Sequence, residues 1–380
     1  MEFVAILFMV IVLLAAQLVL FAKNSFRHFD YSCSFTKDEV LEGDEVGLVE
    51  TISNRKWLPL PWLKSELSTS KWLEYAGSQS EVIGELRFVP SFFALKSYQK
   101  ISRTWRVKCL KRGVFEIGRV DLVGSDLLGF SSFSYSAKVG ARLTVLPRPL
   151  ENSEPARPPQ YFGGDLVVRR QLLDDPFFIA GVREYTGFEP MNRIHWTATA
   201  REGKLMVFQN QYTSRKNLAI LLNAQPRPGH STRMDGDSDF EDCVRFCAYL
   251  FGVAAKEDVP FRFLCNGADC ATHLPVRTGE SWGEAFALEQ TRTLARLQAD
   301  NAQKLPLFLQ EGASALSCTE LILVSTYVDD AIQSFAREAS RAGVSVSVFV
   351  RGALLSGDYD EDAYFLSVLQ PSGKKEEDTQ

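Results

Sequence analysis

Several features that mark common functional classes are scarce in this chain. Its 380 residues include four histidines, and no phosphate-binding loop, G-x-G-x-x-G or H-E-x-x-H signature occurs. Basic side chains do not exceed acidic ones, because 42 Lys and Arg residues stand against 47 Asp and Glu, a net charge of −5. A nucleic-acid partner is therefore not expected, since such surfaces need a basic excess. We also expect no enzyme activity and no cofactor.

Cysteine is present in an odd number and without a dense framework. The seven residues are Cys33, Cys109, Cys243, Cys247, Cys265, Cys270 and Cys318. Such scatter indicates a reducing compartment rather than a disulfide-stabilised extracellular domain. The spacing of Cys243 and Cys247 and of Cys265 and Cys270 also raises a zinc site. Core packing is favoured, because Cys243 and Cys247 share a helical face with apolar side chains.

Charge is absent from Phe3–Ala22, where Gln17 is the one polar side chain. Twenty helical residues at about 1.5 Å each reach about 30 Å, which is the thickness of a bilayer core. We expect residues 1–22 to form a retained transmembrane anchor, with a cleaved signal peptide and a buried soluble helix as alternatives. Lys23 and Arg27 follow the run and favour a cytoplasmic location for the rest of the protein. The predicted localisation is thus the cell inner membrane, single-pass.

The remaining chain divides by pattern at a proline-rich segment. Residues 23–146 alternate apolar and polar side chains in short runs, which predicts an all-β sandwich domain. Five prolines in residues 147–159 predict an extended linker over 147–160. In residues 161–370, buried-type strands at 217–224 and 320–328 alternate with helical stretches, including 239–256 and 281–303. This alternation predicts an α/β domain with a mostly parallel sheet, followed by a disordered tail at 371–380.

One stretch of the α/β half carries a family resemblance. Arg183-Glu184-Tyr185, Arg193, Trp196 and Arg201 follow one another at a spacing that resembles the signature of the domain of unknown function 58 family. The segment Lys111–Phe130 is also similar to that family's region before the linker. This chain departs from the pattern with Phe188-Glu189 in place of Gly-Asp, with His195 in place of aspartate, and with one N-terminal apolar helix where many relatives have two.

The resemblance implies a fold and a class of partner. It implies a von Willebrand A-like α/β domain, whose first strand normally ends in a D-x-S-x-S magnesium site. Here Asn223, Gln225 and Arg227 occupy that segment, and two amides and a cation are poor ligands for magnesium. We therefore expect a degenerate site that binds no metal. The resemblance further implies a protein partner, namely a MoxR-type AAA+ ATPase or another von Willebrand A-like protein.

The stretch Arg183–Arg201 has three possible roles. In an enzyme, His195 would act as base, Glu184 or Glu189 as acid, and Arg183 or Tyr185 would stabilise charge. As a structural brace, Arg183 and Arg193 would pair with Glu184, Glu189 or Asp175, while Tyr185 and Trp196 become buried. As a binding surface, its Arg, Tyr and Trp are the residue types of interface hot spots. We favour a membrane-anchored, non-enzymatic adaptor, with a hydrolase-like or ligand-binding protein as the alternative.

Overall fold

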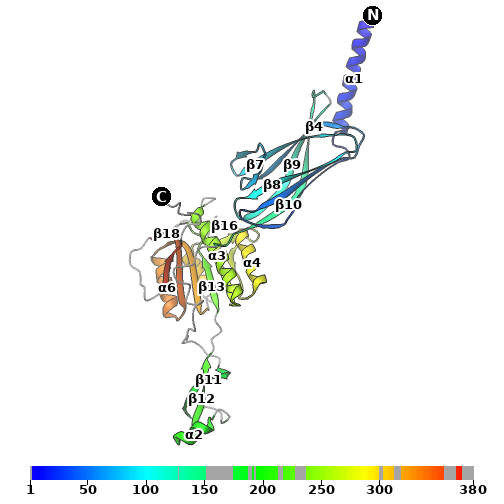
Figure 1. The fold of residues 1–380 in the computed structure, drawn as a ribbon. Helices are drawn as coiled ribbons and strands as arrows, with labels where there is room; N and C mark the ends of the chain where they lie inside the picture. The colour runs from blue at the N-terminus through cyan, green and yellow to red at the C-terminus, as the bar shows by residue number, and fades with distance from the viewer. Residues whose placement is uncertain are drawn as a thin grey trace, which may run out of the picture.

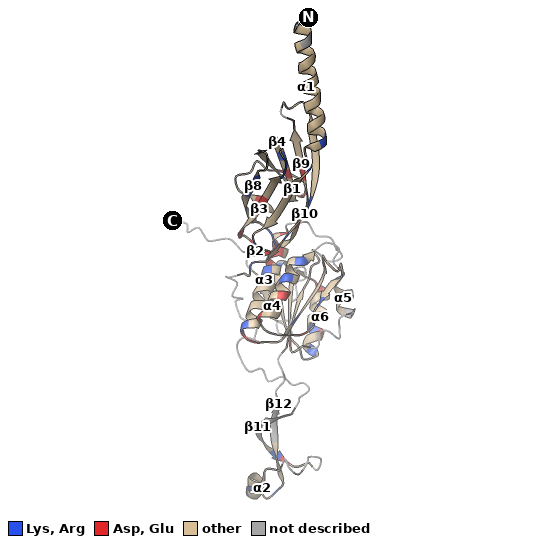
Figure 2. Ribbon diagram, turned by 90° about the vertical axis from the view of Figure 1, so that its right-hand side faces the viewer, with Lys and Arg blue, Asp and Glu red and all other residues tan. Residues whose placement is uncertain are grey.

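The molecule is elongated, with its parts arranged along one axis. The computed structural model describes residues 2–126, 128–150, 174–186, 191, 194–212, 217–226, 237–298, 303–311, 318–354 and 365–369. Figures 1 and 2 show an N-terminal helix at one end, then a β domain, an α/β domain, and a two-stranded hairpin at the opposite end. The predicted linker lies outside the described residues from residue 151 onward, and the predicted tail lies wholly outside them.

The N-terminal helix α1 (Glu2–Asn24) stands away from the rest of the protein. Most of its side chains are exposed, and only near its end does Phe21 become buried. The hydroxyl of Ser25 donates to the carbonyl oxygen of Phe21 at 2.6 Å, which satisfies one of the last helical carbonyls. The segment Ile6–Asn24 has a mean hydropathy of 2.6 and is long and apolar enough to cross a membrane, as a span or as a signal sequence.

The β domain is a sandwich of two sheets, as the alternating pattern predicted. The first sheet runs in the order β1 (Phe29–Phe35), β3 (Glu45–Asn54), β8 (Lys100–Cys109), β5 (Leu73–Tyr75). The second runs in the order β2 (Glu39–Leu41), β10 (Ser132–Leu146), β9 (Gly113–Ser125), β4 (Leu60–Ser70), β7 (Leu86–Leu95), β6 (Glu81–Ile83). Alternate residues of β3 are buried, so one face of this strand meets the opposite sheet.

The α/β domain is built on one mostly parallel sheet. Its order is β15 (Pro275–Arg277), β14 (Phe261–Asp269), β13 (Leu218–Leu222), β17 (Glu320–Val328), β18 (Ser345–Leu354), β19 (Phe365–Val368). Strands β14, β13, β17, β18 and β19 are parallel neighbours, whereas β15 and the short β16 (Leu297–Gln298) run antiparallel to β14. All five residues of β13 are buried, as expected for a strand covered on both faces.

Helices cover both faces of this sheet. The helices are α3 (Ser238–Lys256), α4 (Glu284–Arg296), α5 (Leu305–Glu311) and α6 (Asp330–Arg341). The even-numbered apolar residues of β13 pack with α3 and α4, and its odd-numbered ones pack with α5 and α6. One helix was predicted wrongly: α4 ends at Arg296 instead of continuing to residue 303. The chain leaves the helix there because Leu297 and Gln298 pair with the edge of β14.

Candidate functional site

The stretch Arg183–Arg201 lies on an arm that projects from the α/β domain. The arm is the antiparallel pair β11 (Asp174–Glu184) and β12 (Met206–Tyr212), with the short helix α2 (Trp196–Glu202) at its tip. Figures 1 and 2 both place this arm at the end of the molecule farthest from α1. The described residues of this stretch are therefore presented away from both domains.

Local hydrogen bonds hold α2 against the arm's strands. The Nδ1 atom of His195 accepts from the backbone N–H of Ala198 at 3.0 Å, so His195 is the N-cap of α2. The hydroxyl oxygen of Thr199 accepts from the N–H of Met206 at 2.9 Å. Gly203 ends the helix with a φ of 69°, a left-handed conformation that glycine adopts without strain. The arm thus has a defined shape although it has little core.

Most of the described motif residues are on the surface of this arm. Arg183, Glu184 and Arg201 are exposed, and 65% of Trp196 is accessible to solvent. Tyr185 is half-buried, whereas Arg193 and Glu189 lie outside the described residues. The burial of Trp196 expected for a structural brace is therefore wrong. The physical reason is that the arm has two strands and one short helix, and among the arm residues whose burial is described, Ile194 and Val207 are the ones that are buried.

The groups that an acid–base mechanism would use have structural partners here. The carboxylate of Glu184 lies 3.4 Å from Nζ of Lys204, and both side chains are well exposed. His195 uses Nδ1 for the cap, and its ring lies 4.5 Å from that of Phe208. An open, water-exposed surface of this kind offers little of the enclosure in which charge stabilisation becomes strong.

One match to an enzyme signature was overlooked in the sequence interpretation. Residues 279–283 read Gly-Glu-Ser-Trp-Gly, which fits the G-x-S-x-G pattern of serine hydrolases. In that pattern the serine occupies a strained turn between a strand and a helix. Here Ser281 forms an antiparallel bridge with Phe261, with hydrogen bonds in both directions, and the residue with positive φ is Gly283. Ser281 is thus held as an edge residue rather than presented as a nucleophile.

The carboxyl edge of the parallel sheet holds a network of amides where a von Willebrand A-type metal site would lie. The side chain of Asn223 donates to the hydroxyl of Ser325 and accepts from Asn266, each at 3.0 Å. Gln225 accepts from the N–H of Leu305 at 2.8 Å. Asn223, Gln225 and Asn266 are almost fully buried. Neutral amides already paired with one another leave no negative charge for a divalent cation, while Arg227 lies outside the described residues.

The cysteines of α3 lie in the hydrophobic core. Cys243, Cys247 and Cys265 belong to the cluster that packs α3 against the sheet, which agrees with the predicted core role. Burial raises the pKa of Cys247 well above its usual value, so the thiolate that would bind zinc is disfavoured. No group of three or more His, Cys, Asp or Glu side chains suited to a metal is found among the described residues.

The junction between the two domains is a charged site that the sequence interpretation missed. Arg112, in the turn between β8 and β9, is buried and donates from Nε to Oε2 of Glu241 in α3 at 2.8 Å. Its Nη1 donates to the carbonyls of Leu294 and Leu297, where α4 ends. A cation at the end of a helix also meets the negative end of the helix dipole. In the sequence, Arg112 stands in an Arg-Gly turn, and nothing local indicates that it pairs with Glu241, 129 residues further along the chain.

Two further arginines, Arg245 and Arg292, form ion pairs at this junction. Arg245 of α3 makes a bidentate contact with Glu42, at 2.6 and 3.0 Å, and also bonds Asp242 at 2.8 Å. Arg292 of α4 makes a second bidentate contact, with Glu39, at 2.7 and 3.0 Å. These contacts join the β2 end of the sandwich to the two helices on one face of the α/β sheet. The junction therefore resists rotation of one domain against the other.

Comparisons with known proteins do not assign the chain to a family. No protein-family model matches it, and no curated protein matches it in sequence. It is similar to a non-cellulosomal cohesin from the archaeon Archaeoglobus fulgidus, with 13% identity over 31% of this chain and 91% of the cohesin, at a TM-score of 0.22. It is also similar to domains D2 and D3 of the major pilin SpaD of Corynebacterium diphtheriae, with 12% identity over 29% of this chain and 50% of that one, at a TM-score of 0.23. Likenesses with such scores carry no argument on function.

Proposed function

We propose that this protein is a membrane-anchored, non-enzymatic adaptor that binds a protein partner through the arm formed by β11, α2 and β12. The observation that carries the proposal is the exposure of Trp196, together with Arg183 and Arg201, at the end of the molecule farthest from α1. Tryptophan and arginine are the side chains most often found at interface hot spots. An anchor at one end and such a surface at the other fit a protein that holds its partner at a distance from the membrane.

The composition of the arm supports a protein partner. Besides Trp196, the exposed apolar side chains in the described part of the arm are Val182, Met191 and Leu205. Arg183, Arg201 and Lys204 lie among them and are exposed as well. Apolar side chains rimmed by charge are typical of protein interfaces, in which apolar contacts supply affinity and the charges supply orientation.

The class of partner follows from the resemblance to the domain of unknown function 58 family. We propose a MoxR-type AAA+ ATPase, or another von Willebrand A-like protein, as the partner. The mostly parallel sheet with helices on both faces is compatible with a von Willebrand A-like domain. Since Asn223 and Gln225 occupy the place of the magnesium ligands, binding is proposed to need no divalent cation.

The proposal is tested by measuring binding of the full chain, in detergent, to a purified MoxR-type ATPase. Trp196→Ala and Arg201→Ala should each weaken binding about 30-fold, which corresponds to about 2 kcal/mol at a hot spot. The matched control is Trp282→Ala, because Trp282 is 57% exposed but lies on the α/β domain. Equal binding by all four proteins would refute a role for the arm. Addition of a chelator should change nothing.

The proposed anchor is a retained span in the inner membrane, with both domains in the cytoplasm. Lys23 and Arg27 follow the apolar helix and favour that orientation. Carbonate washing should leave the full chain in the membrane pellet. A reporter fused after Gln380 should be active if it functions in the cytoplasm, and activity of a periplasmic reporter there would reverse the orientation.

A further inference from the structure

The end of the β sandwich nearest α1 exposes several aromatic side chains. The register of the strands places the connection after α1, the loops 55–59 and 96–99, and the turn 126–131 at this end, because Phe29 pairs with Asn54 and Ser53 with Lys100. We call it the membrane-proximal end. The aromatic side chains that the β domain exposes within the described residues all lie in this half: Trp57, Trp62, Phe92, Tyr98, Phe130 and Tyr135.

We propose that this surface lies in the headgroup layer of the bilayer that α1 crosses and contacts lipid there. This inference depends on the anchor assigned under the proposed function. Tryptophan and tyrosine gather at membrane interfaces because each has a large apolar ring and one hydrogen-bonding tip. Trp57, Trp62 and Tyr98 are between 62% and 72% exposed, so their rings face solvent when no lipid is present.

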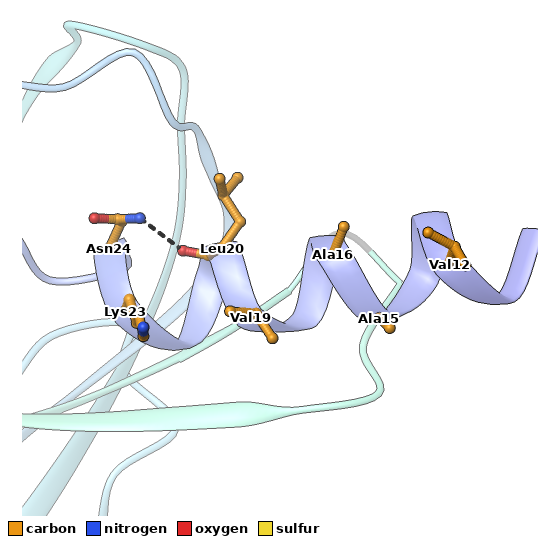
Figure 3. Close-up of a pocket in the computed structure, with 7 residues that line it drawn as sticks. All are labelled: Val12, Ala15, Ala16, Val19, Leu20, Lys23 and Asn24. Carbon is orange, nitrogen blue, oxygen red and sulfur yellow. Dashed lines mark hydrogen bonds between the residues drawn. The ribbon is translucent and has the colours of Figure 1, made fainter. Parts of the chain in front are cut away.

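The turn between β9 and β10 rises beside α1. Figures 1 and 2 show it alongside the helix from two sides, and in Figure 3 it approaches the level of Ala15 and Ala16. Ala16 lies eight residues before Asn24, which corresponds to about 12 Å along the helix. A turn at that level enters the membrane if Ile6–Asn24 spans it.

The sequence and shape of this turn suit a lipid environment. Leu128 and Phe130 are 54% and 72% exposed, whereas the one charged side chain of the turn, Asp126, is buried. The N–H of Asp126 donates to the carbonyl of Ser131 at 3.2 Å, which closes the turn, and Gly129 has the positive φ that the tight bend requires. The turn therefore exposes apolar side chains while its carboxylate faces inward.

Contacts with the residues after α1 fix the position of this end relative to the helix. The ring of Phe26 stacks on that of Tyr135, with centroids 5.3 Å apart. The buried Lys56 donates from Nζ to the carbonyl of Ser25 at 2.7 Å and to Oδ1 of Asn54 at 2.9 Å. The sandwich is thus bonded to the end of α1 rather than tethered by a free linker, so its membrane-proximal end stays at the level of the interface.

The charge of this end also fits a bilayer surface. The segments 23–28, 55–59, 96–99 and 126–131 contain five Lys or Arg residues against one carboxylate, Asp126; of these five, Lys56 is buried and Arg55 pairs with Asp30 at the start of β1. Basic side chains near a membrane are attracted to anionic lipids by about 1 kcal/mol each. The opposite end of the sandwich differs, because the loop 36–44 contains four carboxylates and one lysine and faces the α/β domain.

The test uses the full chain in vesicles of phosphatidylcholine and phosphatidylglycerol, with or without bromine in the acyl chains. Bromine quenches tryptophan fluorescence at short range. In a Trp57→Phe and Trp62→Phe background, Phe130→Trp adds a sensor to the turn, and Ile83→Trp is the matched control. Ile83 is 61% exposed but lies at the opposite end, since it pairs with Leu86 at the start of β7.

We expect bromolipids to quench the Phe130→Trp sensor at least twofold more strongly than the Ile83→Trp sensor. Both substitutions are at exposed apolar positions and should leave folding intact. Equal, weak quenching of the two sensors in protein that resists carbonate extraction would overturn the lipid-facing surface and leave the anchor standing. Release of the protein by carbonate would overturn both. Neither readout depends on the partner of the arm.

Discussion

Replacing Arg112 should uncouple the two domains at a high cost in stability. Its guanidinium is 4% exposed and faces the carboxylate of Glu241, of which 9% is exposed. Arg112→Met leaves that carboxylate in a buried site, with Lys111 at 3.8 Å as its remaining cation. Breaking a buried pair by removing one partner typically costs 3–5 kcal/mol. We expect a loss in this range, with a further contribution from the carbonyls of Leu294 and Leu297.

A double-mutant cycle separates the pair from these other contacts. Glu241→Met alone leaves a buried guanidinium, whereas the double variant Arg112→Met/Glu241→Met leaves neither charge. The double variant should therefore lose about 2–3 kcal/mol less than the sum of the two single variants. The free energy of unfolding is measured in urea on the full chain in detergent, with fluorescence and circular dichroism required to give the same transition. Strict additivity would refute the pair as a coupled unit.

Three further predictions concern buried polar groups. Glu50 accepts from Tyr31 at 2.9 Å and from Ser65 at 2.6 Å, so Glu50→Ala should cost about 1–3 kcal/mol for each donor left unpaired, as measured by urea unfolding. Asn223→Ala should destabilise the protein by a similar amount. Magnesium should not raise the melting temperature of the natural protein in a thermal shift assay. A rise that Asn223→Ala abolishes would show that Asn223 helps to bind the metal. Burial lowers the pKa of Lys56 from 10.5 to about 8. Between about pH 8 and 10.5 the unfolded chain therefore binds a proton that the folded chain does not, so stability contributed at this site rises with pH. Urea titrations across that window should show this rise, and Lys56→Met should remove it.

Elements with a strong local pattern could be predicted from the sequence. The strand expected at 320–328 is β17, because a short, mostly apolar run is typical of a strand covered on both faces. All nine of its residues are buried. The helix expected from Asp239 to Lys256 is α3, with Asp237 as its cap. The end of α4 could not be predicted, because the helical pattern continues past Arg296. What stops the helix is the free edge of β14, a tertiary feature that no local pattern encodes.

The candidate site was harder to predict than the fold. Arginine, tyrosine and tryptophan occur both in buried braces and on binding surfaces, so their types alone did not decide the burial of Trp196. Burial depends on whether a second layer covers the segment, and none of the described residues forms such a layer over Trp196. The junction at Arg112 and the cluster at Glu50 were missed for a related reason. Each joins residues far apart in the chain, and their pairing becomes visible only in three dimensions.

The two ends of the sandwich are bonded to different parts of the protein. At one end, Lys56 and Phe26 bond the domain to the end of α1. At the other, Arg112 and the bidentate pairs of Arg245 and Arg292 bond it to α3 and α4. Rotation at either end would leave a buried cation or a buried carboxylate without its partner, which costs several kcal/mol. The α/β domain and α1 are therefore connected through a stiff body, which under the proposed function would hold the partner of the arm on the side of the protein that faces away from the bilayer.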